Sequence, residues 1–327
     1  MSDDAADAIG KVDPGTLADS VFGHTGAQDD AVVRGPAYGE DAAVIDLGGE
    51  YLVVSTDPIS LAVGRLGRLG VDVACNDVAV TGATPRWLTI CVFLPGRDEA
   101  LDEIARGVDE AARRSDVAVV GGHTEYAPAL DRPTLVVTAM GLGGSFVPTG
   151  GASPGDRILL TKGAGIEATA ILATDFRDRL ADVPDDVLDE AATYYDAVSI
   201  RAEAAALSPH ASAMHDPTEG GVLTGLYELA VAGGVGLDVD VDAVPVRQPT
   251  ARCCAAAGVD PLSVLGSGAL LATVPSDAAG SAMAAVDDAG VHVADVGRVV
   301  EADEPTVLLD DAVVGGPVRD GMYDLWT

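Results

Sequence analysis

Residues 76–88 read NDVAVTGATPRWL, a stretch in which an expected helix ends and an expected strand begins. Apolar side chains recur at helical spacing up to this point, so we predict a helix over residues 65–81. Gly82 and Pro85 are residues of the kind that end helices. Asp77 then lies on an otherwise apolar helix face, where a carboxylate is costly unless it is paired or binds a metal. The stretch therefore predicts a buried helix that carries one carboxylate in need of a partner.

Two short apolar runs precede this helix and predict a β-hairpin. Residues 42–47, AAVIDL, and residues 51–55, YLVVS, are joined through Gly48-Gly49, which suits a tight turn. The second run continues into Asp57 and Pro58. Because proline cannot extend a central ladder, we expect the strand to end there and to leave Asp57 at its tip.

The rest of the chain alternates strands and helices in two halves. Residues 145–156, SFVPTGGASPGD, shift toward Gly, Pro and Ser and form the expected domain boundary. We therefore predict an α+β or α/β protein of two domains, residues 1–147 and 148–327. The further predictions are an irregular or helical arm over 1–30, strands at 87–94, 117–125 (ending in a glycine turn), 134–141, 268–275 and 291–300, helices at 98–114, 222–232 and 276–289, a strand–turn–helix unit from Arg157, and a helical stretch at 185–206.

The composition is strongly acidic. Among 327 residues, 52 are acidic and 19 basic, for a net charge of −33; 39 of the acids are aspartate, and lysine occurs only at 11 and 162. Such a surface repels itself at low salt and is screened in concentrated salt, which is typical of salt-adapted organisms. An acidic binding protein or a disordered tail fits less well, because the acids are spread over patterned sequence. The basic face that nucleic-acid binding requires is missing.

Hydropathy and cysteine usage indicate the compartment. No run of about 18 apolar residues occurs, so we expect no membrane span. The first residues, MSDDAADAIG, are acidic and unlike a secretory leader, so we expect a cytoplasmic protein. Cys75, Cys91, Cys253 and Cys254 form no C-x-x-C pair, which disfavours a zinc site; we expect all four to be small buried side chains.

Polar side chains gather at the ends of the apolar segments. Each alone has an ordinary explanation as a turn or capping residue. Together, hard oxygen ligands from separate strand and helix ends suit Mg²⁺, which prefers carboxylates, water and phosphate oxygens. Glycine turns beside them let backbone N–H groups approach phosphate. The set comprises Glu40, Asp41, Asp57, Asn76 and Asp77, then His123, Thr124 and Glu125 after Gly121-Gly122, and Asp216, Thr218 and Glu219 before Gly220-Gly221.

The last group belongs to the loop HDPTEGG, residues 215–221. A glycine loop at a helix start is a natural anion site, so we expect Gly220 and Gly221 to face phosphate while the acids reach it through Mg²⁺ or bind substrate. His215 is interpreted as a mere neighbour of the site, and His123 as a candidate general base. No P-loop, dinucleotide fingerprint, H-E-x-x-H or G-x-S-x-G motif is present, which disfavours those enzyme classes.

Five motifs occur in a fixed order along the chain: GEDAAVIDLG, VVSTDPI, NDVAVTGATPRWL, GGHTE and DPTEGG. Through them the chain resembles the aminoimidazole ribonucleotide synthetase (PurM)-like superfamily, and most of all its HypE-like hydrogenase maturation factors, through the third and fifth motifs. The resemblance implies an N-terminal domain that pairs with its copy in a homodimer to build a barrel-like sheet. It also implies a C-terminal α/β domain, with ATP and Mg²⁺ in the cleft between the two.

The same resemblance implies roles for matching residues. Those that would hold the metal are Glu40, Asp41, Asp57 and Asp77. Those that would border the nucleotide or its phosphates are Gly39, Asp41, Asp57, Asn76, Gly121, Gly122, Thr124 and Thr218. The catalytic candidates are His123, Asp216 and Glu219.

The chain departs from HypE-like sequences at charged positions. They have Asp where His123 stands, Lys where Glu125 stands and Arg where Glu219 stands, and the superfamily often has Asp in place of Glu40. Two positive charges near the phosphates are therefore missing. HypE proteins end in a reactive cysteine, whereas this sequence ends GMYDLWT and its last cysteine is Cys254. We interpret the chain as a HypE-like paralogue with a different substrate.

Three functions follow as alternatives. The first is an ATP- and Mg²⁺-dependent enzyme that phosphorylates an amide- or carbonyl-type oxygen of a small molecule, as superfamily members typically do. The second is a small-molecule kinase resembling thiamine-monophosphate kinase. The third is a nucleotide-binding scaffold that has lost catalysis and binds a maturation protein.

Overall fold

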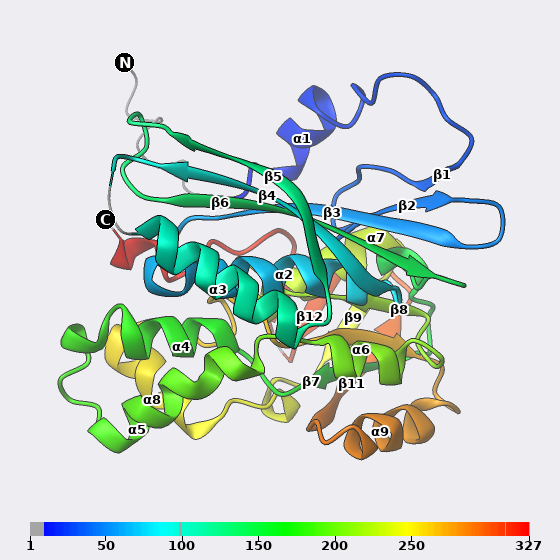
Figure 1. The fold of residues 1–327 in the computed structure, drawn as a ribbon. Coiled ribbons are helices and arrows are strands. Elements are labelled where there is room, and N and C mark those ends of the chain that lie inside the picture. The colour runs from blue at the N-terminus through cyan, green and yellow to red at the C-terminus, as the bar shows by residue number, and fades with distance from the viewer. Residues whose placement is uncertain (1–9, 98–99, 311, 327) are drawn as a thin grey trace.

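The computed structural model describes residues 10–97, 100–310 and 312–326, and shows two β-sheets with their helices (Figure 1). One sheet has six strands and lies in the N-terminal half; the other has seven strands and lies in the C-terminal half. The predicted α+β architecture of two domains is confirmed. The exact boundary after residue 147 stays a prediction.

The N-terminal sheet has the strand order β1-β2-β3-β6-β4-β5. Its neighbours are antiparallel except β4 and β5, which run parallel. Side chains of β4 and β6 alternate between buried and less buried, as expected for a sheet with one covered face. The strands are β1 (Val32–Arg34), β2 (Ala43–Asp46), β3 (Tyr51–Ile59), β4 (Thr84–Leu94), β5 (Ala118–Tyr126) and β6 (Thr134–Gly143).

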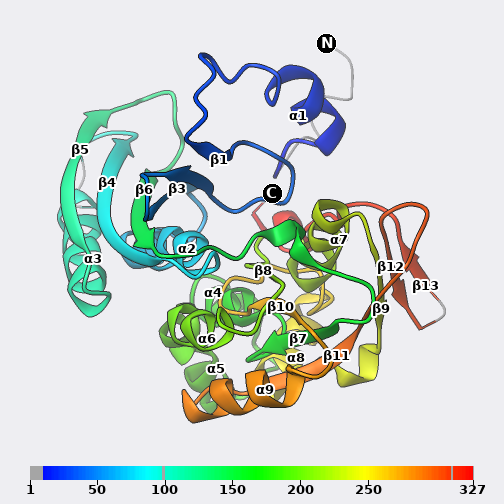
Figure 2. The same ribbon diagram turned by 90° about the vertical axis from the view of Figure 1, so that its right-hand side faces the viewer.

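Two helices cover one face of this sheet (Figure 1). α2 (Leu66–Ala79) is buried along almost its whole length, and α3 (Ala100–Arg114) buries one stripe that includes Ile104 and Val108. The helices cross closely at Gly67, where a Cβ would lie 2.3 Å from the carbonyl oxygen of Ile104. Both helices were predicted within two residues at each described end, because their apolar spacing is regular. Figure 2 shows α2 at the junction of the two domains.

Two strand ends differ from the prediction. β3 does not end at Asp57 but continues through Pro58 to Ile59, paired throughout with β6. The proline is tolerated because the pairing with β2 has already stopped at Val54, so this part of β3 has only one neighbour. Likewise β5 does not turn at Gly121-Gly122 but runs on to Tyr126 beside β4.

The C-terminal sheet has the order β13-β12-β9-β11-β7-β10-β8. β12 and β9 are parallel and the other pairs are antiparallel. The predicted strands near 268–275 and 291–300 correspond to β10 and β11. The strands are β7 (Arg157–Thr161), β8 (Ala213–His215), β9 (Gly236–Val239), β10 (Leu271–Val274), β11 (Val293–Val300), β12 (Thr306–Leu309) and β13 (Ala312–Val314).

Helices surround this second sheet (Figure 2). The predicted helix at 222–232 is confirmed as α7, and the one at 276–289 as α9. The predicted helical stretch at 185–206 is instead two short α-helices separated by a 3₁₀ turn at Thr193–Ala197. The helices are α1 (Pro14–Ser20), which precedes the first sheet, then α4 (Ile166–Thr174), α5 (Asp185–Ala192), α6 (Arg201–Leu207), α7 (Gly221–Gly233), α8 (Gln248–Ala257) and α9 (Ala279–Asp288).

A hydrophobic core shared by both domains fixes their positions relative to each other. Leu69 and Val73 of α2 belong to the same buried cluster as Ile166 and Ile171 of α4. The side-chain amide of Asn76 spans the junction, donating to the carbonyl of Val198 at 2.9 Å and accepting from the N–H of Ile200 at 3.0 Å. The domains are therefore held by apolar packing and by polar bonds to the segment between α5 and α6.

The cysteine and membrane predictions have separate outcomes. All four cysteines are free thiols, and Cys75, Cys253 and Cys254 are buried as predicted. Cys91, on β4, is only partly buried, which corrects the prediction for that residue. In the part of the chain that the structure describes, no helix is both long and apolar enough to cross a bilayer.

Candidate functional site

Three of the predicted metal ligands are neighbours at the junction of the domains. Asp77 is 5% exposed and accepts a 2.5 Å hydrogen bond from the Ser55 hydroxyl. Burial raises the pKa of Asp77 well above its usual value, and the charges of Asp57 and Asp41 add to the effect. The predicted need of Asp77 for a partner is therefore met only in part, by one hydroxyl, while neighbouring carboxylates repel its charge.

Asp216 enters this cluster from the second domain. It follows β8, is 1% exposed, and neither of its carboxylate oxygens has a hydrogen-bond partner among the described residues. Burial raises its pKa well above the usual value; Asp41 acts in the same direction, whereas His215 and Lys162 oppose it. A buried carboxylate without partners is costly unless a cation or a donor completes its environment.

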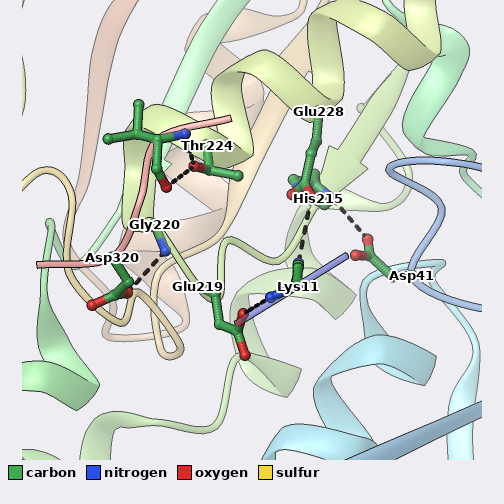
Figure 3. A network of polar contacts seen from close by, with 9 residues as sticks. Lys11, Asp41, His215, Glu219, Gly220, Thr224, Glu228 and Asp320 are labelled. Atoms are coloured by element: carbon green, nitrogen blue, oxygen red, sulfur yellow. Dashed lines mark hydrogen bonds and ion pairs between the residues drawn. The ribbon is translucent and has the colours of Figure 1, made fainter. Parts of the chain in front are cut away.

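His215 is central to the site, and its interpretation as a mere neighbour is wrong. Its Nδ1 lies 3.0 Å from Oδ2 of Asp41, and its Nε2 lies 2.9 Å from Oε2 of Glu228 (Figure 3). Burial alone would lower the pKa of His215, but the two carboxylates outweigh it and raise the pKa to about 10. The ring is therefore an imidazolium that donates on both sides and joins the two domains.

Glu228 and Lys11 complete this network, and the sequence interpretation missed both as site residues. Lys11 Nζ lies 3.4 Å from Oε1 of Glu228, and the backbone N–H of Lys11 donates to Oε2 of Glu219 at 2.9 Å (Figure 3). Burial acts to lower the pKa of Lys11, but Glu228, Glu219 and Asp41 outweigh it and raise the pKa. The available signal was scarcity, because Lys11 is one of only two lysines.

The N–H groups at the end of the loop before α7 are bonded to acceptors of the protein itself, one of them the carboxylate of Asp320. Gly220 and Gly221 have φ of +73° and +61°. The N–H of Gly220 donates to Oδ2 of Asp320 at 2.9 Å, and that of Gly221 donates to the carbonyl of Thr218 at 3.1 Å. Both N–H groups thus have protein acceptors, so the expectation that these glycines face phosphate is not supported.

Two predicted residues before β2 sit beside this network. Glu40 is partly buried, and burial raises its pKa against the opposing charge of Arg34. Gly39 has φ of +80°, and a Cβ there would lie 3.0 Å from the carbonyl oxygen of Glu228. Gly39 is therefore required for a close approach to α7, which is a different reason from the contact with nucleotide that was predicted.

The predicted residues of β5 do not join the cluster within one chain. Gly121, Gly122, His123 and Thr124 are exposed on the edge strand of the first sheet. His123 Nε2 lies 3.1 Å from Oε2 of Glu125, so the histidine pairs with a residue of its own strand. The role of these residues at a nucleotide stays a prediction. So does that of Asn76, whose amide is committed to the domain junction.

A cavity of about 340 Å³ opens beside the carboxylates, and we call it the interdomain cavity. Asp57 lines it from the first domain, Thr218 and Glu219 line it from the second, and Lys11 lines it from the N-terminal arm. Glu167 lies in its wall, 7% exposed, and burial raises its pKa to about 7. A larger cavity, of about 720 Å³ between α2 and α3, contains none of the predicted site residues.

The chain matches known proteins along most of its length. Residues 39–143 match the AIR synthase related protein N-terminal domain, and residues 153–310 match the C-terminal domain of the same family. "Carbamoyl dehydratase HypE" of Bradyrhizobium diazoefficiens is 30% identical over 87% of this chain and 84% of its own. The protein of the same name from Azotobacter vinelandii is 33% identical over 84% of this chain and 83% of its own.

Solved structures share the fold. HypE in complex with ATP has a TM-score of 0.67 at 24% identity and covers 90% of both chains. The HypE–HypF complex has a TM-score of 0.72 at 24% identity, over 93% of this chain and all of the other. AaThiL, complexed with AMPPCP and TMP, has a TM-score of 0.71 at 20% identity, over 86% and 90%. From the family domains and the HypE relatives, the chain belongs to the AIR synthase related family and is an enzyme of the HypE-like branch predicted from its motifs.

Proposed function

We propose that the protein uses ATP and Mg²⁺ to phosphorylate the carbonyl-type oxygen of a small amide, so that this oxygen can leave as phosphate. The observation that carries the proposal is Asp216, a buried carboxylate with two unpartnered oxygens beside Asp41 and, through Asp41, the Asp57–Asp77 pair. Relatives named carbamoyl dehydratase and a HypE solved with ATP support the same chemistry.

The donor set fits a hard cation. No three metal-ligating side chains among the described residues lie in a ready coordination shell, yet the charges of Asp57 and Asp41 make the ionised form of Asp77 more costly. These three, with Glu40 and Asp216, would hold Mg²⁺, which favours carboxylates and phosphate oxygens. When bound, the ion would offset the negative charge of the phosphates that this acidic site must accept.

The chemical step balances without a further reagent. The amide oxygen attacks the γ-phosphorus of ATP, the bond to the β-phosphate oxygen breaks, and ADP leaves. The phosphorylated amide then loses phosphate and both protons of its NH₂ nitrogen, one to the phosphate and one to solvent, which is a net dehydration. In our proposal Asp216 and Glu219 orient the substrate, and the imidazolium of His215 holds Asp41 in place.

A homodimer is part of the proposal. β5 is an edge strand with exposed Val119, Val120 and Tyr126, the kind of surface that a second copy would cover. Pairing at β5 would also bring His123 and Thr124 of one copy next to the other copy. In our proposal, their predicted contact with nucleotide is made at this dimer interface. A cytoplasmic location is likewise retained as a prediction.

Specific observations support two alternative functions, a kinase and a scaffold. A kinase would have the same fold, since AaThiL was solved with AMPPCP and TMP, but it would leave the phosphoryl group on its product. A scaffold would bind ATP without turnover and would bind a maturation protein, as the HypE–HypF complex suggests for its relative. Glu125 and Glu219, which stand where cations are expected, favour the scaffold; the buried carboxylates favour the enzyme.

The test is ATP binding and turnover by purified protein with Mg²⁺. We expect Asp57→Asn and Asp216→Asn each to weaken Mg²⁺-dependent ATP binding by at least the ~10–100-fold typical of disturbed metal sites. Asp109→Asn, a matched charge change at an exposed position of α3, should leave it unchanged. Unchanged binding in both site variants would show that the metal assignment is wrong.

Turnover separates the three functions. With an amide labelled at its carbonyl with oxygen-18, a dehydrating enzyme releases labelled phosphate. A kinase keeps the label in a phosphorylated product, and a scaffold releases no ADP with any amide offered.

A further inference from the structure

A second cavity, of about 250 Å³, shares Gly10, Lys11 and Glu219 with the interdomain cavity. We call it the terminal cavity, because residues 10–14 near one end of the chain and residues 317–320 near the other form much of its wall. Tyr38 and Tyr323 complete the lining that matters for recognition. The two cavities are therefore adjacent, and a molecule in the terminal cavity lies next to the proposed ATP site.

The wall contributed by the C-terminal segment is fixed in place. The N–H of Val318 donates to the Thr224 hydroxyl at 2.9 Å, and that hydroxyl donates back to the Val318 carbonyl at 3.2 Å. Asp320 accepts a hydrogen bond from the N–H of Gly220 at 2.9 Å (Figure 3), and it accepts another from the N–H of Met322 at 2.8 Å. The terminal cavity is thus pre-formed, as small-molecule sites usually are.

Two tyrosine hydroxyls in this cavity are without partners. Tyr323 is 5% exposed, and neither its hydroxyl nor that of Tyr38 has a hydrogen-bond partner among the residues that the structure describes. Burial and the nearby Glu219 raise the pKa of Tyr323, and burial with the charge of Glu228 raises that of Tyr38, so both phenols stay protonated. Buried hydroxyls that lack partners point to a ligand that supplies them.

The surrounding charges limit what that ligand is. Four carboxylates line the cavity, those of Asp13, Glu219, Glu228 and Asp320. Two cations line it as well: Lys11, which is bound to Glu219 and Glu228, and Arg319, which is paired with Asp324. Both oxygens of Asp320 are used by backbone N–H groups, and those of Glu228 are used by Lys11 and His215. An anionic ligand would meet carboxylate charge, and a cationic one would find few open acceptors. Apolar Val12, Pro14 and Pro317 form part of the remaining wall.

We propose that the terminal cavity binds the substrate, a small uncharged molecule with an amide-type group. One phenol donates to the carbonyl oxygen and the other accepts from the N–H, which an amide offers side by side and which neither a carboxylate nor an ammonium can match. The inference rests on the proposed function and deepens it, because it names the substrate class and two specificity residues, Tyr38 and Tyr323.

The test compares three molecules of nearly equal size by ligand-observed NMR titration: propionamide, propionate and propylammonium. We expect propionamide to bind and each ion to bind at least about tenfold more weakly, since a net charge is poorly compensated there. Tyr38→Phe and Tyr323→Phe each remove one neutral hydrogen bond, so each should weaken propionamide binding about fivefold. Tyr51→Phe, on β3 and outside the lining of both cavities, is the matched control.

Each outcome of these titrations either supports or overturns the inference. Equal binding of propionate and propionamide, or unchanged propionamide binding in the Tyr38→Phe, Tyr323→Phe double variant, overturns the inference. Thermal melting checks that the variants fold, and Tyr38→Phe serves alone if the buried Tyr323 does not tolerate change. Turnover keeps the two proposals apart: a protein that releases ADP with an amide, while the Tyr38→Phe, Tyr323→Phe double variant binds that amide unchanged, refutes only this inference.

Discussion

His215 in the second domain and Asp41 in the first are joined by a 3.0 Å hydrogen bond, although they are 174 residues apart in the chain. The other ring nitrogen is bound to Glu228 at 2.9 Å, so the imidazolium has a carboxylate on each side. The proposed metal-binding carboxylate is therefore positioned by a cation of the opposite domain.

Replacing this histidine should destabilise the protein strongly. His215→Phe keeps a ring but leaves Asp41 without its cation and Glu228 with Lys11 alone, and removing one partner from a buried ion pair costs about 3–5 kcal/mol. Urea unfolding should show this loss, whereas His24→Phe, at an exposed position, should change little. An unchanged unfolding midpoint for His215→Phe would mean that the carboxylates find other partners.

Gly220 can be tested against a glycine of the same conformation. Gly220 has φ of +73°, and a Cβ would lie 2.3 Å from the Val318 carbonyl oxygen; Gly258 has φ of +72° and nothing within 4 Å. Gly258→Ala should cost only the backbone strain of about 1 kcal/mol. Gly220→Ala should cost more, because the C-terminal segment must also shift. Equal losses in thermal or urea unfolding would contradict the close packing at Val318.

The buried Glu167 predicts a pH dependence of stability. Burial raises its pKa from 4.5 to about 7 in the folded protein. A raised folded pKa contributes stability that is fully present below pH 4.5 and is lost as pH rises through about 7, an effect of order 3 kcal/mol. Glu167→Gln should therefore gain stability relative to the wild type over this range, as measured by urea unfolding at several pH values. A constant difference between the two would contradict the assignment.

The net charge of −33 predicts that salt stabilises the fold. Raising KCl from about 0.1 M to about 1 M shortens the screening length from about 10 Å to about 3 Å, which weakens repulsion among the exposed carboxylates. We expect the melting temperature to rise clearly over this range. Sucrose, which acts by exclusion from the surface and not by screening, is the control. A rise with sucrose alone would argue against adaptation to salt.

Local patterns were sufficient to predict many of the regular elements, but they gave no prediction for β9, α8, β12 or β13. The helical spacing of Val73, Asp77 and Val80 predicted α2, and the amphipathic pattern of residues 98–114 predicted α3, because each helix meets its neighbours along a continuous face. The end of β3 was mispredicted because the tolerance of Pro58 depends on where β2 stops pairing, which the sequence of β3 does not contain.

The sequence predicted which residue types form the site, but it did not predict the contacts between distant segments. Asp41, Asp57 and Asp77 were identified from their positions at element ends and from the family motifs, and the structure makes them neighbours. The role of His215 depends on Asp41 and Glu228, and that of Lys11 on Glu219 and Glu228, which are contacts between distant segments. No local pattern reports such contacts, so these residues emerged only from the folded chain.

The meeting of the two ends of the chain has a consequence for synthesis. A Cβ on Gly10 would lie 2.8 Å from the Tyr323 ring, so the first and last described segments touch at the terminal cavity. During translation the N-terminal domain emerges first and folds first. Residues 317–320 and Tyr323, which line the cavity, are translated after β13, the last described strand, so a chain truncated before them can contain both sheets and still lack this pocket. The cavity therefore forms only after residues 317–323 have been synthesised.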